Sequence, residues 1–263
     1  QASCSCSGLY RPCSAALAMA VGVVMKAPEG CARRDAGPIQ APITRPAPSH
    51  LMIPPLVQRL KALGIDDLLV VFGLGTHRRM TDEEERRLLQ GCVSLPHRQH
   101  DPKDCLLQGE TARGTPVEIL EVVASSDLIV ATGNIEYHYY AGYSGGAKAV
   151  LPGVSSERSV VKNHELMRDP ASVTGRLDSP VRLDMEDAAG IAGLDFILNA
   201  VLNSRKEIVQ SVAGDYIAAH RLGAATVDRM YRRPVEPAGI VVACAGGRPK
   251  DLNLFQAQKA LEN

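Results

Sequence analysis

The sequence offers little that would direct the protein to nucleic acid, to a membrane or to an oxidising compartment. Its 29 basic and 29 acidic side chains balance, so it lacks the excess positive charge with which proteins bind nucleic acid or anionic lipid surfaces. No run of about eighteen apolar residues is present, so we expect no transmembrane helix. The 7 cysteines are odd in number and include no CxxC pair, which argues against a disulfide framework and favours a reducing, cytoplasmic setting.

Residues 1–40 lack a regular pattern. They show neither the alternation of a strand nor the periodicity of a helix, and they are rich in Ser, Cys, Gly, Pro and Ala. The apolar run at residues 15–25 has the length of a signal-peptide core, but Arg11 is the only basic residue before it and the residues after it form a poor cleavage site. We therefore predict an atypical segment that need not be ordered, and no export signal.

From residue 41 onward the pattern changes to alternating helices and strands, as is typical of α/β proteins. Thr81 and Glu84 have the spacing of a capping box, which predicts a helix that begins at Thr81. We predict a large N-terminal α/β domain with a mostly parallel sheet over residues 41–231. Its other expected helices are 54–64, 155–167 (capped by Ser155 or Ser156), 182–193 and 215–231, and its expected strands are 68–73, 127–133, 195–203 and 206–214.

A second domain is expected to begin near the end of the sequence. Residues 232–239, RRPVEPAG, contain two prolines that break the helical pattern and predict a hinge. Residues 240–263 then have the pattern of a strand, a glycine loop and a helix. We interpret them as the truncated start of a C-terminal α/β domain, and the chain as a fragment.

Three unusual loops follow predicted strands, at residues 73–78, 133–148 and 244–251. Ligands of parallel α/β sheets bind beyond the carboxyl ends of the strands, so these loops are candidates for a functional site. In the second loop, Gly142, Gly145 and Gly146 leave backbone amides free to face an anion, and Lys148 adds a positive charge or a nucleophilic amine. The loop lacks the GK[ST] ending of a nucleoside-triphosphate site, so we expect another phosphate-bearing ligand.

The histidines suggest acid/base chemistry and a metal. His77 and His138 lie in loops just after predicted strands, where a general acid or base is usually placed. His164 lies in a predicted helix and could bind a metal, although no HExxH pattern of a zinc hydrolase is present. The alternative is that Lys148 and His164 are ordinary surface and helix residues. For His97 and His100 in a polar loop, and for His220 on a polar helix face, we expect surface or structural roles.

Five segments, in the same order, resemble the nickel-dependent lactate racemase family. They cover the sequence from about residue 41 to residue 263, and the third is the most specific. The segments are ITRPAPSHLMIPP, GLGTHRRMTDEE, GNIEYHYYAGYSGGAKAVLPGV, KNH and AGGRPKDLNLFQAQKAL.

The resemblance implies a cofactor that residue chemistry alone does not name. Members of the family carry a nickel-pincer mononucleotide, a pyridinium derivative that grips nickel through one carbon and two sulfurs. By resemblance, Lys148 would be its covalent tether, His164 would complete the nickel coordination, and the loop of Ser144, Gly145 and Gly146 would hold its phosphate. Enzymes that synthesise the cofactor are therefore expected partners.

The reaction implied by the resemblance is racemisation of a small 2-hydroxy acid through transient oxidation. His77 and His138 would act as alternating acid and base on the two faces of the substrate. Arg45 would bind the substrate carboxylate, and Gln256 and Lys259 would contact the substrate from the second domain.

Two positions depart from the family pattern. Pro42 stands where an Asp is usual, three residues before the arginine, and Phe255 stands where a tyrosine occurs. Two alternatives to a lactate-like racemase therefore stay open. One is an epimerase of a larger hydroxy acid, and the other is a non-catalytic, ligand-binding fragment of the same fold.

Overall fold

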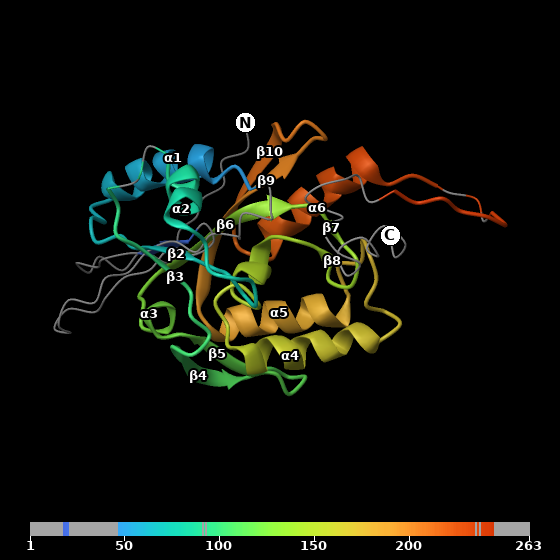
Figure 1. Ribbon diagram of the computed structural model, residues 1–263, viewed down its shortest axis with the longest axis horizontal. Helices are drawn as coiled ribbons and strands as arrows, with labels where there is room; N and C mark the ends of the chain where they lie inside the picture. The colour runs from blue at the N-terminus through green and yellow to red at the C-terminus, as the bar shows by residue number, and fades with distance from the viewer. Residues whose placement is uncertain are drawn as a thin grey trace, which may run out of the picture.

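The computed structural model describes residues 47–90, 92, 94–234, 236 and 238–244, together with the backbone of residues 18–20. Across these residues the chain forms one six-stranded sheet with helices around it, and two separate two-stranded sheets (Figure 1). Among the helices so described, none has the length and apolar character needed to cross a membrane.

The six-stranded sheet has the order β10, β9, β6, β1, β2, β3, and all of its neighbouring strands are parallel except β9 and β10. Every residue of β2 and β6 is buried, as expected of parallel strands covered on both faces. The mostly parallel α/β fold is thus confirmed. The strands are β1 (Ala18–Ala20), β2 (Val70–Phe72), β3 (His97–Gln99), β6 (Ile129–Ile135), β9 (Leu194–Leu202) and β10 (Ile208–Gly214).

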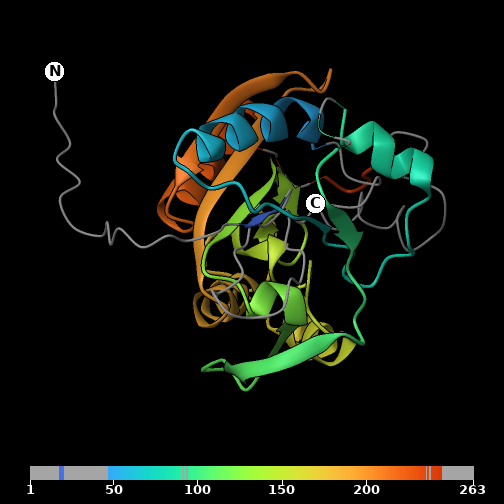
Figure 2. The ribbon, with the colours of Figure 1, turned by 90° about the vertical axis from the view of Figure 1, so that its left-hand side faces the viewer.

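Helices pack against the sheet from two sides. The first set is α1 (Ser49–Lys61), which contacts β6, and α6 (Ala218–Tyr231), which contacts β6, β9 and β10. The second is α5 (Pro180–Ile191), which contacts β9 and the short turn η1 (Gly146–Ala149), with α4 (Glu157–Glu165) packed against it. Both ribbon views show α4 and α5 together on the side away from α1 and α6 (Figure 2).

Smaller elements surround this frame. The two-stranded sheets are the pair β4 and β5, which lies beside α4, and the short pair β7 and β8, which follows β6. The remaining helices are short. The bounds are α2 (Asp82–Leu88), β4 (Cys105–Glu110), β5 (Pro116–Leu120), α3 (Glu121–Ala124), β7 (Tyr137–His138), β8 (Gly142–Tyr143) and η2 (Leu166–Arg168).

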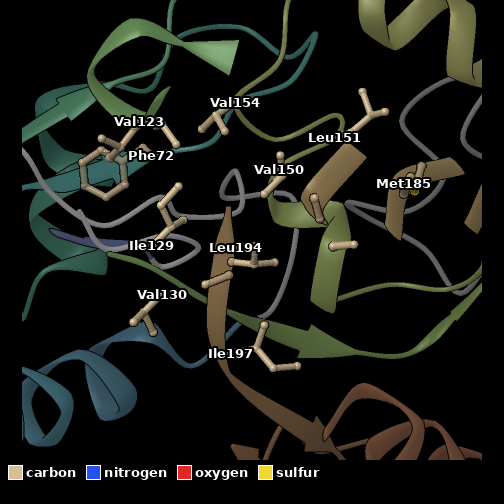
Figure 3. Packing of buried hydrophobic residues seen from close by; sticks show 14 of the residues in the cluster. Phe72, Val123, Ile129, Val130, Val150, Leu151, Val154, Met185, Leu194 and Ile197 are labelled. Atoms are coloured by element: carbon tan, nitrogen blue, oxygen red, sulfur yellow. The ribbon is translucent and has the colours of Figure 1, made fainter. Parts of the chain in front are cut away.

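The hydrophobic core joins the sheet to η1 and α5. Val130 of β6, Ile197 of β9 and Met185 of α5 are buried in one cluster with Val150, which directly follows η1 (Figure 3). Burial of each such side chain stabilises the fold by about 1.5–3 kcal/mol. The turn η1, which contains Lys148, is therefore anchored in the core at its C-terminal end by Val150.

Several sequence predictions can be compared with these elements. The capping box of Thr81 and Glu84 is present, and α4 begins after the cap residue Ser156. The predicted start of the first helix at Pro54 is wrong, since α1 begins at Ser49 and contains Pro54 and Pro55. Burial of Met52 and Ile53 in the turn before these prolines explains why the helix tolerates two missing amide donors.

The end of the described chain also differs from its prediction. Residues 240–244 were expected to form a strand, but the structure assigns none there, and Ile240 and Val242 are 86% and 93% exposed. A strand needs a hydrogen-bonded neighbour, and no described strand runs beside this segment. The division into a domain, a hinge and a second domain stays a prediction.

Candidate functional site

The candidate site is built on the loop after β6, which runs through the small β7 and β8 hairpin into η1. In the hairpin, Tyr137 pairs with Tyr143 and His138 pairs with Gly142. The three residues between the strands form the tip, and η1 then carries Lys148. One loop thus holds both His138 and Lys148, as the position of the loop in the sequence predicts.

Tyr140, at the tip, brings three of the predicted residues together. The centroid of its ring lies 4.6 Å from that of His138 and 5.1 Å from that of His164, and the Lys148 Nζ lies 5.6 Å above it. The ring of His138 also stacks on Tyr139, with the centroids 5.2 Å apart. The structure therefore assembles His138, Lys148 and His164 into one cluster, although α4 contributes the last of them.

His138 is buried, with 7% of its surface exposed. Its Nδ1 lies 3.3 Å from the amide nitrogen of Ala141 and accepts that hydrogen bond. In the neutral ring the proton is then on Nε2, the nitrogen that can exchange it with a ligand. This arrangement suits a general acid or base whose orientation is fixed by its own hairpin.

His164 has the properties of a neutral imidazole. Burial, followed by the positive charge of Lys148, lowers its pKa to about 4, and the backbone of Val160 offsets only part of this shift. Its Nδ1 is buried and makes no hydrogen bond to the described residues. Burying a ring nitrogen without a hydrogen-bond partner costs free energy. The burial is explained if a ligand or a metal binds this nitrogen.

A fully buried arginine fixes the carbonyl groups of the loop. Arg182 of α5 donates hydrogen bonds to the carbonyl oxygens of Ala141 at 3.3 Å and Gly145 at 3.2 Å, and also to that of Tyr143. Burial lowers the pKa of its guanidinium to about 10, so the group stays charged at neutral pH. One side chain therefore binds the carbonyl groups of every second residue from 141 to 145.

Two further buried side chains fix the glycines. The Gly146 amide donates to Asn199 Oδ1 at 2.7 Å, and a Cβ on Gly145 would come within 2.6 Å of that oxygen. A Cβ on Gly146 would come within 2.9 Å of the His220 ring, and both glycines have positive φ. Glycine is therefore required at both positions by close packing as well as by backbone conformation.

His220 differs from its prediction. It was expected on a polar face of its helix, but it is fully buried and its Nε2 lies 2.8 Å from the Ser144 carbonyl oxygen. Burial, and then the charge of Arg182, hold the pKa of this histidine well below its usual value. His100 is also buried rather than part of a polar surface, and burial lowers its pKa to about 4.

The hydrogen bonds of the glycine loop bear on the predicted phosphate site. The Ser144 amide donates to the Glu136 carbonyl at 2.8 Å, and its hydroxyl lies 2.9 Å from both the Asn134 carbonyl oxygen and the Glu136 amide. With the Gly146 amide bound to Asn199, these groups already serve the loop itself. A phosphate contact by Ser144, Gly145 or Gly146 stays a prediction.

His77 lies on the adjacent loop, after β2. The loop is joined to the lysine loop by a hydrogen bond from the Gly75 amide to the Gly153 carbonyl at 2.9 Å. His77 itself is exposed. The structure thus places His77 on a loop that contacts the segment after η1, at the carboxyl end of a parallel strand that is separated from β6 by β1.

Some predicted site residues are not covered, and some important residues were not predicted. Arg45, Gln256 and Lys259 lie outside the described residues. Arg182, Asn199 and His220 were not predicted to hold the loop, because they reach it from α5, β9 and α6 and have no sequence spacing in common with it. Of the three, Asn199 alone has a signal in the sequence, as a polar residue within an otherwise apolar strand.

Comparisons with known proteins find a match over most of the chain. A family model described as the lactate racemase N-terminal domain matches residues 38–175. The chain is 35% identical to the lactate racemase of Lactiplantibacillus plantarum and 34% identical to that of Thermoanaerobacterium thermosaccharolyticum. Each of these matches covers 83% of this chain. It spans about half of these relatives, 54% and 53% respectively.

Solved structures give the same picture of the fold. The lactate racemase apoprotein from T. thermosaccharolyticum superposes with a TM-score of 0.80 at 34% identity, over 83% of this chain and 55% of that one. A protein from Thermotoga maritima superposes with a TM-score of 0.63 at 21% identity, over 74% of this chain and 55% of that one. The second match supports the fold alone.

Proposed function

The chain belongs to the lactate racemase family, and from this premise we propose that it forms the cofactor-binding part of a racemase of lactate or a similar 2-hydroxy acid. The observation that carries the proposal is the cluster of His138, Lys148 and His164 around the ring of Tyr140. A buried base, an amine and a neutral imidazole meet there at the carboxyl end of a parallel strand.

The residues of the cluster fit a nickel-pincer cofactor. The described part of the chain contains no group of three or more His, Cys, Asp or Glu side chains that could hold a metal unaided. His164 nevertheless offers a buried ring nitrogen without a partner. A metal at this position would need most of its ligands from another source, as a pincer supplies, and imidazole suits nickel.

In this proposal Lys148 tethers the cofactor and His164 completes the nickel coordination. The chemistry that such a cofactor would supply when bound is reversible hydride acceptance. Soft sulfur ligands with one imidazole agree with the preferences of Ni(II). The phosphate of the cofactor is assigned to the loop of Ser144, Gly145 and Gly146, as the resemblance implies.

The two histidines move the proton of the substrate hydroxyl. Racemisation requires an acid/base group on each face of the substrate, because the α-hydrogen that leaves from one face returns to the opposite face. His138 presents Nε2 for this transfer while Ala141 holds Nδ1. His77, from the adjacent loop, is proposed for the other face.

The remaining assignments concern the substrate and the cell. Arg45 is proposed to bind the substrate carboxylate through a bidentate guanidinium, and Gln256 and Lys259 to contact the substrate from the second domain. The enzymes that synthesise the cofactor are proposed as partners. A cytoplasmic location is proposed from the cysteine pattern described above.

The proposal is tested by following the conversion of one lactate enantiomer into the other with the purified protein, produced together with the cofactor-synthesis enzymes. Replacement of either catalytic histidine, His77→Ala or His138→Ala, should lower the rate by about 10²-fold or more while nickel stays bound. The matched control is His97→Ala on β3, outside the cluster, which should keep the parent rate.

Each alternative predicts a different result in this assay. Turnover of a larger 2-hydroxy acid without turnover of lactate would favour the related epimerase. No turnover of either substrate by a protein that carries nickel would favour a non-catalytic role. A His77→Ala or His138→Ala variant that racemises at the parent rate would show that the assigned base is wrong.

A further inference from the structure

The hairpin that carries His138 is anchored at its base by one carboxylate. Asp228 of α6 accepts hydrogen bonds from the hydroxyl groups of Tyr137 at 2.8 Å and Tyr143 at 2.6 Å. These tyrosines are register partners across β7 and β8, and their ring centroids lie 5.5 Å apart. Asp228 therefore holds both strands of the hairpin at the pair directly before His138.

The same carboxylate is itself fixed in place. Asp228 forms an ion pair with Arg232 at 3.1 Å, one turn later in α6. Arg232 donates to the Gly175 carbonyl at 3.2 Å, and the Tyr143 hydroxyl lies 3.1 Å from that same oxygen. The base of the hairpin is thus joined to α6 and to the segment around Gly175.

An anchor of this kind is needed because the hairpin is small. It contains two residue pairs, Tyr137 with Tyr143 and His138 with Gly142, and an isolated hairpin of this size is not stable in water. The position of the hairpin, and with it that of His138, therefore depends on contacts with the rest of the protein. Asp228 supplies two of these contacts, the hydrogen bonds to the tyrosine hydroxyls at the base of the hairpin.

Other side chains hold the rest of the loop. Arg182 binds the carbonyl groups of Ala141 and Tyr143 in the hairpin and of Gly145 after it, and Asn199 and His220 hold Gly146 and Ser144. The part of the loop that leads to Lys148 therefore has anchors that do not involve the Asp228 carboxylate. Loss of the Asp228 carboxylate should consequently disturb His138 more than it disturbs Lys148. The two effects can be separated by experiment.

We propose that Asp228, acting through Tyr137 and Tyr143, is a positioning residue that sets the orientation of His138 for proton transfer. The inference rests on the function proposed above. It assigns to Asp228 a role in the acid/base step and none in the binding of the cofactor.

The first test compares Asp228→Ala with Asp195→Ala in the cofactor-loaded protein. Alanine removes the acceptor, whereas the amide oxygen of asparagine could still accept from both tyrosine hydroxyls. Asp195 is the matched control, because its carboxylate accepts the Ile129 amide at 2.8 Å at the opposite end of β6. Asp228→Ala should lower kcat by about tenfold or more, since a displacement of about 1 Å in a reacting group can cost about 10²-fold. The KM and the nickel content should stay at the parent values, and the control should match the parent throughout.

The second test does not depend on activity. In the cofactor-free protein, the His138 ring proton resonances are shifted by the rings of Tyr139 and Tyr140, which lie within 5.2 Å. Asp228→Ala should move the His138 cross-peak in a ¹H–¹³C spectrum, and Asp195→Ala should leave it in place. An unmoved cross-peak, or an unchanged kcat in a protein that racemises, would overturn the inference.

A pair of conservative replacements keeps the inference testable if Asp228→Ala does not fold. The double variant Tyr137→Phe/Tyr143→Phe leaves the ion pair of Asp228 and Arg232 intact and should reproduce both effects. Combining it with Asp228→Ala should add little, because all three replacements remove the same contacts. If the parent protein racemises no hydroxy acid, the proposed function fails, and the cross-peak alone then decides whether Asp228 orients His138.

Discussion

The loops after β6 and after β2 both leave the carboxyl ends of parallel strands, with β1 between those two strands, yet they are built differently. The loop after β6 is held by buried side chains from three other elements, Arg182, Asn199 and His220. The loop after β2 is held by backbone hydrogen bonds of Gly75 and His77, and its histidine is exposed. In the function proposed above, this difference leaves the cofactor side of the site preorganised and the His77 side open to solvent and to substrate.

The largest difference between the loops should appear when a buried clamp is removed. Arg182→Met leaves the carbonyls of Ala141, Tyr143 and Gly145 buried without their donor, and it should lower the free energy of unfolding by about 3–5 kcal/mol. The matched control is Arg79→Met, which removes an exposed arginine beside the loop after β2. This replacement should change the free energy of unfolding by about 1 kcal/mol or less. Urea unfolding measures both, and equal losses would remove the contrast.

A pair of glycine replacements compares the loops more finely. Gly146→Ala combines a φ of +58° with a clash against the buried His220 ring, and it should cost about 2–4 kcal/mol. Gly75→Ala has a similar φ of +56°, but its nearest neighbour would lie 3.5 Å away, so the cost should be about 1–2 kcal/mol. Similar losses of stability in urea would show that the backbone conformation alone decides the cost.

The clamped loop should also depend on pH through His220. The neutral ring donates from Nε2 to Ser144 and lies 3.4 Å from Arg221 at Nδ1, so both nitrogens are engaged without a second proton. The pKa of His220 is lower in the folded than in the unfolded protein. Its contribution to the free energy of unfolding is therefore fully present above the unfolded pKa of about 6.5. This contribution is lost as the pH falls below that value, at up to about 1.4 kcal/mol per pH unit.

The pH dependence is measured by urea unfolding of the parent and of His220→Gln between pH 7 and pH 4. Because the variant lacks this titration, its stability should fall less steeply with acidification. His100 and His164, whose pKa values burial lowers to about 4, contribute a further decline to both proteins. Parallel slopes for the two proteins would contradict the assignment to His220.

Helix caps provide the smallest expected effect. Ser156 begins α4, which carries His164, and its buried hydroxyl contacts the Ser159 amide and the Glu118 carboxylate. Ser156→Ala should cost about 2 kcal/mol, at the upper end for a cap. Thr81→Ala, at the exposed start of α2, should cost about 1 kcal/mol. Thermal unfolding of the two variants checks the order, and a larger loss for Thr81→Ala would reverse the comparison.

The sequence allows the local features of the fold to be predicted, because they depend on neighbouring residues. The capping box at Thr81 and the apolar strands at β2 and β6 are examples. Strands β7 and β8, with two residues each, are too short to show a period. They are held by tertiary contacts, such as those of the two tyrosines with Asp228, which lies about 90 residues later in the chain.

The residues of the candidate site also fall into those that the sequence predicts and those that only the tertiary structure reveals. His138 and Lys148 could be found from the loop that contains them, and His164 from its resemblance to a known pattern. Arg182 and His220 could not, since a charged or polar residue within a helix usually faces solvent and only the tertiary contacts show otherwise. The misplacement of His220 on a polar face follows from this rule.

The central claim is that Lys148 and His164 jointly hold a nickel-pincer cofactor in the preorganised loop. Intact mass and nickel content, measured on protein produced with the cofactor-synthesis enzymes, test it most directly. The account predicts an added mass that disappears in Lys148→Ala, and about one nickel per chain that is lost in His164→Ala. A protein that gains neither mass nor nickel, or one whose nickel survives His164→Ala, would contradict it.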